Sequence, residues 1–184
     1  MDRERKILDT AAVVFYEKGF HGVGVDELGK RAGLSGPALY RHFSGKDDIL
    51  AALFNEALDE LLSATAPVHK DPEKDLDRLI RHHVGFAVEH RHLVSIYQRE
   101  DRSLVDPWKR QFDRRRRKYV DRWESAVARC FPGAAPDKIA AGTQACLGVI
   151  FCIAYWPAHL AQTPAQADLL AGFAGNGLAA LRRG

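Results

Sequence analysis

Three consecutive polar side chains, those of Tyr40, Arg41 and His42, have the chemistry that nucleic-acid recognition needs. An arginine can donate two parallel hydrogen bonds to the O6 and N7 atoms of a guanine in the major groove. A tyrosine hydroxyl or a lysine ammonium, such as that of Lys46, can bind a phosphate oxygen and so position a protein on DNA. A solvated helix face carries the same residue types, so the neighbouring sequence must decide between these two interpretations.

The sequence before these residues predicts a short amphipathic helix with a sharp stop. Val25, Leu28 and Ala32 recur at helical spacing, with charged residues between them. Gly33 follows, and a residue without a Cβ suits the left-handed conformation that often ends a helix. A helix over about residues 25–32 is therefore expected.

A second short helix, reaching Phe43, is expected directly after this stop. Ser35 can cap its start, and Pro37 is tolerated in a first helical turn. Leu39 and Phe43 lie four residues apart and can pack inward, which leaves residues 40–42 largely outward. Two short helices held together in this way predict a helix-turn-helix whose second helix enters a major groove.

The pattern resembles the DNA-binding domain of the tetracycline-repressor (TetR) family, whose motif is AGxSxxxLYxHFxxKxxL. The chain matches this motif at nine positions with the family's spacing: Ala32, Gly33, Ser35, Leu39, Tyr40, His42, Phe43, Lys46 and Leu50. The resemblance implies an N-terminal DNA-binding domain over residues 1–50. It also implies a C-terminal helical domain for ligand binding and dimerisation over residues 51–184.

The resemblance further implies which residues face DNA: Ser35, Gly36, Pro37, Tyr40, Arg41, His42 and Lys46. Two departures from the family concern this surface. Gly24 and Val25 stand where hydroxyl residues usually contact phosphate, and Gly36 leaves one recognition position without a side chain. Residues 1–50 also contain eight Lys or Arg and eight Asp or Glu, so affinity must come from a few placed contacts and from two copies acting together.

Composition describes an ordinary globular chain of 184 residues, 46% hydrophobic and 28% charged, with a net charge of +3. No apolar run is expected to approach the roughly 20 residues that span a bilayer. The charged N-terminus is a poor secretory signal. The three cysteines, an odd number, do not suggest a disulfide framework. We therefore expect a cytoplasmic protein without a membrane partner.

Helical periodicity and helix breaks predict an all-α fold of about nine helices. Besides the two short helices, we expect one from about Asp2 to Lys18 and one to about Ala64, with Ser44 and Asp47 as its capping box. A linker is expected over residues 66–71. Further helices are expected over residues 72–89, 90–98, 107–131, 136–155 and 163–182, the last with Thr163 as its N-cap.

A run of five basic residues, 114–118, lies within the long helix over residues 107–131. Five consecutive helical residues turn through more than a full circle, so they cannot all face water. The apolar stripe of this helix passes through Arg115 or Arg116. A buried guanidinium needs a partner, and either an internal carboxylate or an anionic ligand would serve.

Aromatic residues concentrate around this arginine run. Plain core packing explains most of them, yet Trp and Tyr also suit cavity walls. The proposed ligand-binding residues are Phe86, Tyr97, Trp108, Phe112, Arg115, Arg116, Tyr119, Trp123, Phe151 and Tyr155. An arginine among aromatic rings favours a ligand with an apolar body and a negative end. The family that the chain resembles includes lipid-responsive regulators that bind acyl-CoA thioesters, and the arginine run with its aromatic neighbours suggests that class of ligand here.

The last two helices are expected to form the interface of a homodimer. Small residues on the first permit close helix approach, and apolar residues on the second can fill the seam. The expected interface residues are Gly142, Ala145, Gly148, Leu170, Phe173, Ala174, Leu178 and Leu181.

The resemblance thus implies a transcriptional regulator, most simply a repressor, that leaves a partly palindromic double-stranded operator when a small-molecule effector binds. A small all-α enzyme and a regulator without any ligand are the alternatives. No nucleophile–base set is recognisable, so no catalytic residue is proposed. His82 and His83 point about 100° apart on a helix and lack further ligands at suitable spacing, so neither a metal nor a cofactor is expected.

Overall fold

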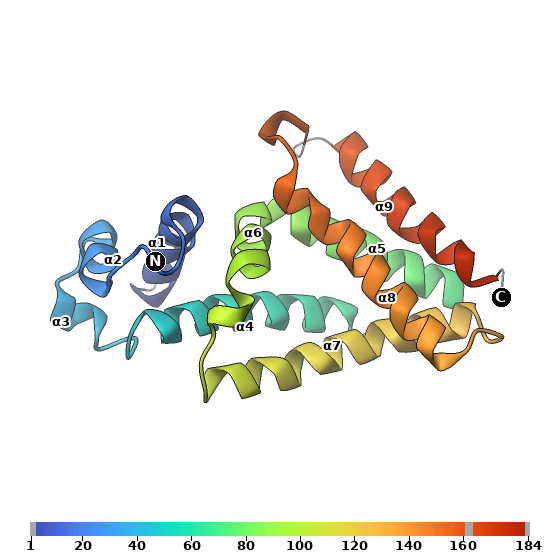
Figure 1. The fold of residues 1–184 in the computed structure, drawn as a ribbon, viewed down its shortest axis with the longest axis horizontal. Coiled ribbons are helices and arrows are strands. Elements are labelled where there is room, and N and C mark those ends of the chain that lie inside the picture. The colour runs from blue at the N-terminus through green and yellow to red at the C-terminus, as the bar shows by residue number, and fades with distance from the viewer. Residues whose placement is uncertain (1–2, 161–163, 183–184) are drawn as a thin grey trace. The chain divides into compact units, whose positions relative to one another are not determined.

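The computed structural model of the chain describes residues 3–160 and 164–182, and every regular element in these two ranges is helical (Figure 1). The α-helices are α1 (Arg3–Lys18), α2 (Val25–Ala32), α3 (Gly36–Leu39), α4 (Lys46–Thr65), α5 (Pro72–Glu89), α6 (Arg91–Glu100), α7 (Trp108–Cys130), α8 (Pro136–Phe151) and α9 (Pro164–Leu178). Short 3₁₀ turns lie between or after these helices, at Asp101–Ser103, Cys152–Tyr155, Ala158–Leu160 and Ala179–Arg182. The expected all-α fold of nine helices is confirmed for the described residues.

Several helix ends lie where local sequence predicts them. Gly19 and Gly33 end α1 and α2 with φ of 75° and 71°, the left-handed region that glycine enters without a Cβ clash. The Asp71 carboxylate caps α5 by accepting hydrogen bonds from the backbone N–H groups of Glu73 at 2.9 Å and Lys74 at 3.2 Å. The expected helix start at Asp2 and the expected cap at Thr163 lie outside the described residues.

The helix α3 is shorter than expected and ends at Leu39 instead of Phe43. The backbone N–H of His42 bonds the Leu39 carbonyl at 2.9 Å, three residues back, and this tighter turn ends the regular helix. Ser35 takes the N-cap position, but its side chain makes no capping hydrogen bond. Tyr40, Arg41 and His42 therefore follow α3 in a turn.

The expected capping box of α4 is wrong by one residue. The first helical bond of α4 runs from the Ile49 N–H to the Gly45 carbonyl, so the helix begins one residue later than expected. The third position of the helix is then Asp48 instead of Asp47. Its Oδ2 accepts from the Ser44 backbone N–H at 2.9 Å and from the Ser44 hydroxyl at 3.1 Å.

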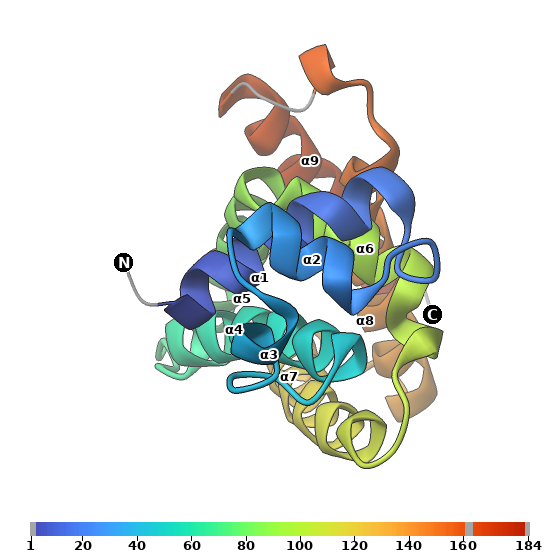
Figure 2. The ribbon, with the colours of Figure 1, turned by 90° about the vertical axis from the view of Figure 1, so that its left-hand side faces the viewer.

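The chain forms two compact units. The first unit comprises residues 1–58 and 92–114, and the second comprises residues 59–91 and 115–184. In the first unit α1 packs against α2, and α2 packs against α3 (Figure 2). Phe15, Leu28 and Leu39, one from each of these helices, are fully buried there. The functional division expected at residue 50 stays a prediction.

Lys46 holds the loop between α1 and α2 in the first unit. Its Nζ donates hydrogen bonds of 3.1 Å to the carbonyls of both Phe20 and Val23. The same ammonium lies 4.6 Å from the centroid of the Phe20 ring, a cation–π distance. A residue at the start of α4 therefore fixes the segment that leads into α2.

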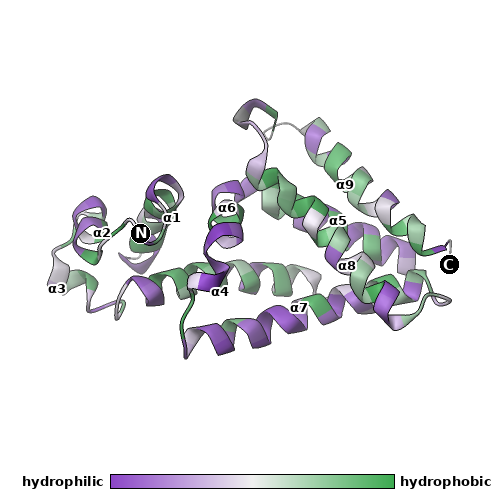
Figure 3. Ribbon diagram, in the orientation of Figure 1, coloured by the Kyte–Doolittle hydropathy of each residue, from purple (hydrophilic) through white to green (hydrophobic). Residues whose placement is uncertain are grey.

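In the second unit α5, α8 and α9 pack against one another. Apolar residues run along most of α8 (Figure 3). By length and composition alone, Pro136–Tyr155 could cross a membrane, so the expectation that no run approaches this length is wrong. This segment contributes Ile139, Leu147 and Ile150 to the core, and both α5 and α9 pack against α8.

A fully buried carboxylate, that of Asp75 on α5, organises the second unit. It accepts hydrogen bonds from three guanidinium groups, those of Arg122 at 2.8 Å, Arg129 at 3.0 Å and Arg78 at 3.4 Å. The backbone N–H of His69 adds a bond of 2.9 Å. Burial raises the pKa of Asp75, but the bonds from His69 and the arginines outweigh burial and hold that pKa below its ordinary value of 3.8.

The same three arginines bind the backbone at the end of α4 and in the segment between α4 and α5. Arg122 Nε donates to one carbonyl at 3.1 Å, and Arg129 Nη2 donates to two carbonyls at 2.9 Å. The carbonyls bound by the three arginines are those of Ala64, Thr65, Pro67, His69 and Lys70. Carbonyls in the last turn of a helix and in irregular segments need donors from elsewhere, and Asp75 balances the charge of the arginines that supply them.

Replacing Asp75 with Asn should lower the free energy of unfolding by about 3–5 kcal/mol, because it strands the guanidinium groups. Chemical denaturation at neutral pH measures this change. The stability from Asp75 is present above pH 3.8 and is lost as pH falls through its lower folded pKa, so the variant and the native chain should converge in acid. The exposed Asp77→Asn, which breaks only a surface pair with Arg81, should cost less than about 1 kcal/mol. Equal costs for both variants would contradict the prediction.

Replacing Lys46 with Met should lower the free energy of unfolding by about 1–3 kcal/mol, because two backbone carbonyls lose their donor. Lys30→Met, at an exposed lysine of α2, is the matched control and should change stability by less than about 0.5 kcal/mol. Denaturation curves for the two variants measure the difference. Indistinguishable curves would show that the Lys46 bonds contribute nothing.

Candidate nucleic-acid interface and buried polar cluster

The residues expected to face DNA lie along α3, the turn after it and the start of α4. Ser35, Pro37, Tyr40 and Arg41 are exposed, and 56% of the Tyr40 surface is open to solvent. Gly36, His42 and Lys46 are half-buried. The short helix and its tight following turn thus hold Tyr40 and Arg41 outward, where an aromatic hydroxyl and a guanidinium can meet a nucleic acid.

Two acidic residues that sequence reasoning missed lie beside this set. His42 Nδ1 lies 3.3 Å from the Glu4 carboxylate. A Cβ added at Gly36 would lie 3.3 Å from Asp26 Oδ1, so Asp26 occupies the space next to the missing side chain. Neither contact is visible in the spacing of the motif, because Glu4 and Asp26 belong to α1 and α2.

Lys46 is less available than the sequence suggests. Two of the three ammonium protons are directed at the Phe20 and Val23 carbonyls, which leaves one for a phosphate oxygen. The phosphate contact expected of Lys46 stays a prediction.

Four of the expected ligand-binding residues gather around His83 of α5, which is 1% exposed. The Tyr119 hydroxyl lies 2.6 Å from His83 Nδ1. Ring centroids lie 5.3 Å away for Phe151, 5.8 Å for Trp123 and 6.5 Å for Phe86. We call His83, Tyr119, Trp123, Phe151 and Phe86 the His83 cluster.

Burial, with a smaller effect from neighbouring His82, lowers the pKa of His83 to about 3, so its imidazole is neutral at pH 7. Burial likewise raises the pKa of the Tyr119 phenol, which therefore keeps its proton. In the sequence, His83 stands out only as a candidate metal ligand, and the spacing of its neighbours argues against that role. Its apolar neighbours on α5, residues 79, 80, 84 and 87, could have marked it as an inward polar residue.

Other expected ligand-binding residues lie elsewhere. Tyr97 and Phe112 pack on Phe54 in the first unit, with ring centroids 5.5 and 5.6 Å from it. Trp108 is half-buried in that unit, whereas Tyr155 is 70% exposed in the second. The aromatic set thus divides between two compact units, because three of its members lie within residues 92–114, which belong to the first unit.

The basic run of α7 divides as helix geometry requires. Arg114, Arg117 and Lys118 are exposed, whereas Arg115 and Arg116 are half-buried. The Arg115 guanidinium bonds the exposed carboxylate of Asp59, an internal ion pair. The arginines of α7 that reach the core carboxylate are Arg122 and Arg129, about two and four helical turns beyond Arg115, and no pattern in the sequence indicated them.

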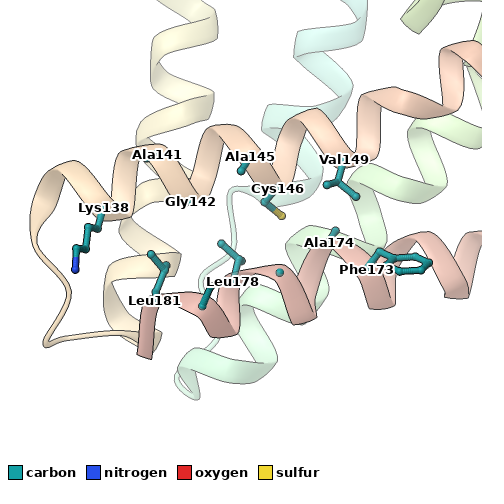
Figure 4. A pocket seen from close by; sticks show the side chains of 12 residues that line it. Lys138, Ala141, Gly142, Ala145, Cys146, Val149, Phe173, Ala174, Leu178 and Leu181 are labelled. Carbon is teal, nitrogen blue, oxygen red and sulfur yellow. The ribbon is translucent and has the colours of Figure 1, made fainter. Parts of the chain in front are cut away.

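The helices α8 and α9 form a groove of about 360 Å³. It is lined by Lys138, Ala141, Gly142, Ala145, Cys146, Val149, Phe173, Ala174, Gly177, Leu178, Ala180 and Leu181, which include six expected interface residues. Lys138 and Leu181 lie toward one end, and Phe173 lies toward the other (Figure 4).

The expected interface residues differ in exposure. Leu170, Ala174 and Leu178 are buried within the single chain, and a Cβ added at Gly142 would lie 3.1 Å from a Leu181 methyl group. Small residues on α8 therefore let α9 approach within one protomer. Ala145 and Gly148 are exposed, and Phe173 has 63% of its surface in solvent.

The remaining candidates for chemistry are metal-binding groups and cysteine thiols among the described residues. Within residues 3–160 and 164–182, no group of three or more His, Cys, Asp and Glu side chains is placed to hold a metal ion. Cys130, Cys146 and Cys152 are free thiols. Burial raises the pKa of the Cys146 thiol to about 12, which makes it a poor nucleophile.

Comparison with known proteins identifies the family. The family model "Bacterial regulatory proteins, tetR family" matches residues 7–53, and "Tetracyclin repressor-like, C-terminal domain" matches residues 69–156. The transcriptional activator FasR of Mycolicibacterium smegmatis is 35% identical over 78 residues, which are 42% of this chain and 36% of FasR. The transcriptional repressor KstR2 of the same organism is 29% identical over 107 residues, 56% of this chain and 52% of KstR2.

The matched segments thus span between about a third and a half of the length of these two relatives. A crystal structure of AibR in complex with isovaleryl coenzyme A and operator DNA has the same fold. Its TM-score is 0.77 at 24% identity, and the match covers 94% of this chain and 97% of that one. With family models matching both its N-terminal and its C-terminal part, the chain belongs to the tetR family of bacterial regulatory proteins.

Proposed function

We propose that the chain is a transcriptional repressor that binds a partly palindromic double-stranded operator as a homodimer and is released by a small-molecule effector. The observation that carries this proposal is the pair of exposed side chains, Tyr40 and Arg41, directly after the second helix of a helix-turn-helix. The relatives are named as transcriptional regulators, which supports a regulator acting on DNA in the cytoplasm over an enzyme.

Within this proposal Arg41 reads a guanine edge, and Tyr40 and Lys46 bind phosphates. The rest of the proposed DNA-binding surface is formed by Ser35, Gly36, Pro37 and His42. The Glu4 and Asp26 carboxylates lie close to this surface and oppose phosphate approach, so we infer that few phosphates are neutralised per protomer. Two protomers acting together then supply the affinity that one lacks.

The homodimer in this proposal forms through the exposed face of α8 and α9. The Phe173 side chain is largely exposed to solvent in the single chain, and it borders an apolar groove. A large exposed aromatic beside small exposed residues such as Ala145 and Gly148 favours a helix-to-helix contact with a second copy.

The proposed effector has an apolar body and a negative end, as an acyl-CoA thioester does. The AibR complex with isovaleryl coenzyme A supports this class, because that protein shares the fold. The His83 cluster offers an apolar, aromatic interior for an acyl chain. The half-buried Arg115 and Arg116, with the exposed Arg117 and Lys118, offer positive charge for the anionic end. Effector binding would favour a spacing of the two recognition helices that no longer fits successive major grooves.

Replacing Arg41 with Ala should weaken operator binding by about 1–3 kcal/mol and relax the preference at one base pair in each half-site. Gel-shift titrations with single-base operator variants measure both effects. Arg81→Ala, at an exposed arginine paired with Asp77 and Asp168, is the control and should leave affinity unchanged. If Arg41→Ala weakens every duplex equally, Arg41 contacts phosphate and not a base.

Replacing Phe173 with Asp should dissociate the dimer and abolish operator binding together, because the interface would bury an unpaired carboxylate at a cost of several kcal/mol. The single chain should keep its fold, since residue 173 is exposed there. Val68→Asp, at a residue 60% exposed in the linker, is the matched control. Sedimentation at micromolar concentration measures the association, and a Phe173→Asp variant that remains dimeric would place the seam elsewhere.

A further inference from the structure

The His83 cluster contains a hydrogen-bond donor whose direction can be assigned. Tyr119 can donate its hydroxyl proton to His83 Nδ1, or it can accept a proton from that atom, at the observed 2.6 Å. If Tyr119 accepts, its own hydroxyl proton has no acceptor among the described residues, and His83 Nε2 is also left as a bare acceptor. If Tyr119 donates, only the His83 Nε2–H group of this pair stays unsatisfied. Since buried polar groups are nearly always paired, the second arrangement holds, and His83 Nε2 carries the proton.

This Nε2–H group is buried and makes no hydrogen bond to any described residue. The Thr143 hydroxyl on α8 is likewise fully buried without a partner in the described part of the chain. Thr143 and Phe151 are two helical turns apart and therefore share a face of α8. A buried donor without an acceptor destabilises a fold, so the presence of one calls for a role.

The surroundings of His83 are mostly aromatic. Four aromatic rings line it, and burial raises the pKa of the Cys146 thiol near Tyr119, which therefore keeps its proton at neutral pH. The nearest cation that acts on Tyr119 is Arg122, whose guanidinium is already bound to Asp75. A carboxylate brought to His83 would therefore be buried without a counter-ion, which is very unfavourable.

We propose that His83 Nε2–H binds an uncharged carbonyl oxygen at the buried end of the effector, the carbonyl of a thioester, ester or ketone. This inference rests on the proposed function and names the polar contact within it. A fatty acyl thioester satisfies both requirements, because its carbonyl is neutral and its charge lies at the far end of the molecule. A free fatty acid does not, because its charge is on the carboxylate itself.

Matched probes of one chain length test the proposal: methyl octanoate, octanoyl-CoA and octanoate at pH 8. Trp123, fully buried in the cluster, allows binding to be followed by its fluorescence. The native protein should bind methyl octanoate and octanoyl-CoA at least about tenfold more tightly than octanoate. Native protein that binds neither carbonyl probe, or that binds octanoate equally well, overturns the proposal.

The double variant His83→Phe with Tyr119→Phe removes both partners of the buried hydrogen bond and leaves neither stranded. It should lose about tenfold in affinity for the two carbonyl probes and keep its affinity for octanoate. His92→Phe, which keeps its stacking on Tyr16 in the first unit, is the control and should bind as the native protein does. Unchanged carbonyl binding by the double variant overturns the proposal.

The single variant Tyr119→Phe covers the case in which the double variant fails to fold. It frees His83 Nδ1 to take the proton, so a smaller loss of a few fold is expected for the carbonyl probes, and no loss refutes the assignment. Gel shifts with the native protein test operator binding separately from the contact between His83 and a ligand carbonyl. Native protein that binds the carbonyl probes but no operator would contradict the proposed function and leave the His83 contact standing.

Discussion

The buried charge of Asp75 is the interaction on which the second unit depends. One carboxylate without solvent contact accepts hydrogen bonds from three arginines. These arginines in turn bind five carbonyls, two at the end of α4 and three in the segment that joins α4 to α5. Each half of this arrangement needs the other. Without Asp75 the guanidinium groups would repel one another beside a low-dielectric core, and without the arginines the irregular backbone would lack donors. A single charged residue on α5 thereby ties the end of α4 to the second half of α7.

Local sequence predicts most of the helices because their ends are set by local chemistry. Gly19, Gly33 and Asp71 act on backbone groups a few residues away, and their effect can be read from neighbours in the chain. The failures are also local in origin. The helix α4 begins one residue later than predicted, because the Gly45 carbonyl and not that of Ser44 accepts its first helical hydrogen bond. The helix α3 ends earlier than predicted, in a tighter turn. Spacing rules locate an element well but place its last residue poorly.

The site was harder to predict because its decisive contacts are tertiary. The arginine run drew attention to Arg115 and Arg116, yet the carboxylate that requires cations lies beside Arg122 and Arg129, which the sequence presents as ordinary surface residues. His83 has no motif around it, and only its burial among apolar positions of α5 reveals it. The seven residues expected to face DNA came from a family motif. Their acidic neighbours Glu4 and Asp26 come from other helices and carry no signal in that motif.

The balance of charge in the first fifty residues has a consequence for how a regulator of this kind would respond to its own abundance. When one protomer holds DNA weakly and a pair holds it well, occupancy of a palindromic site rises with roughly the square of protomer concentration below the dimerisation constant. Small changes in expression would then move the site between mostly empty and mostly filled. Glu4 and Asp26, beside the surface proposed to meet DNA, would thus sharpen the threshold by weakening the single copy.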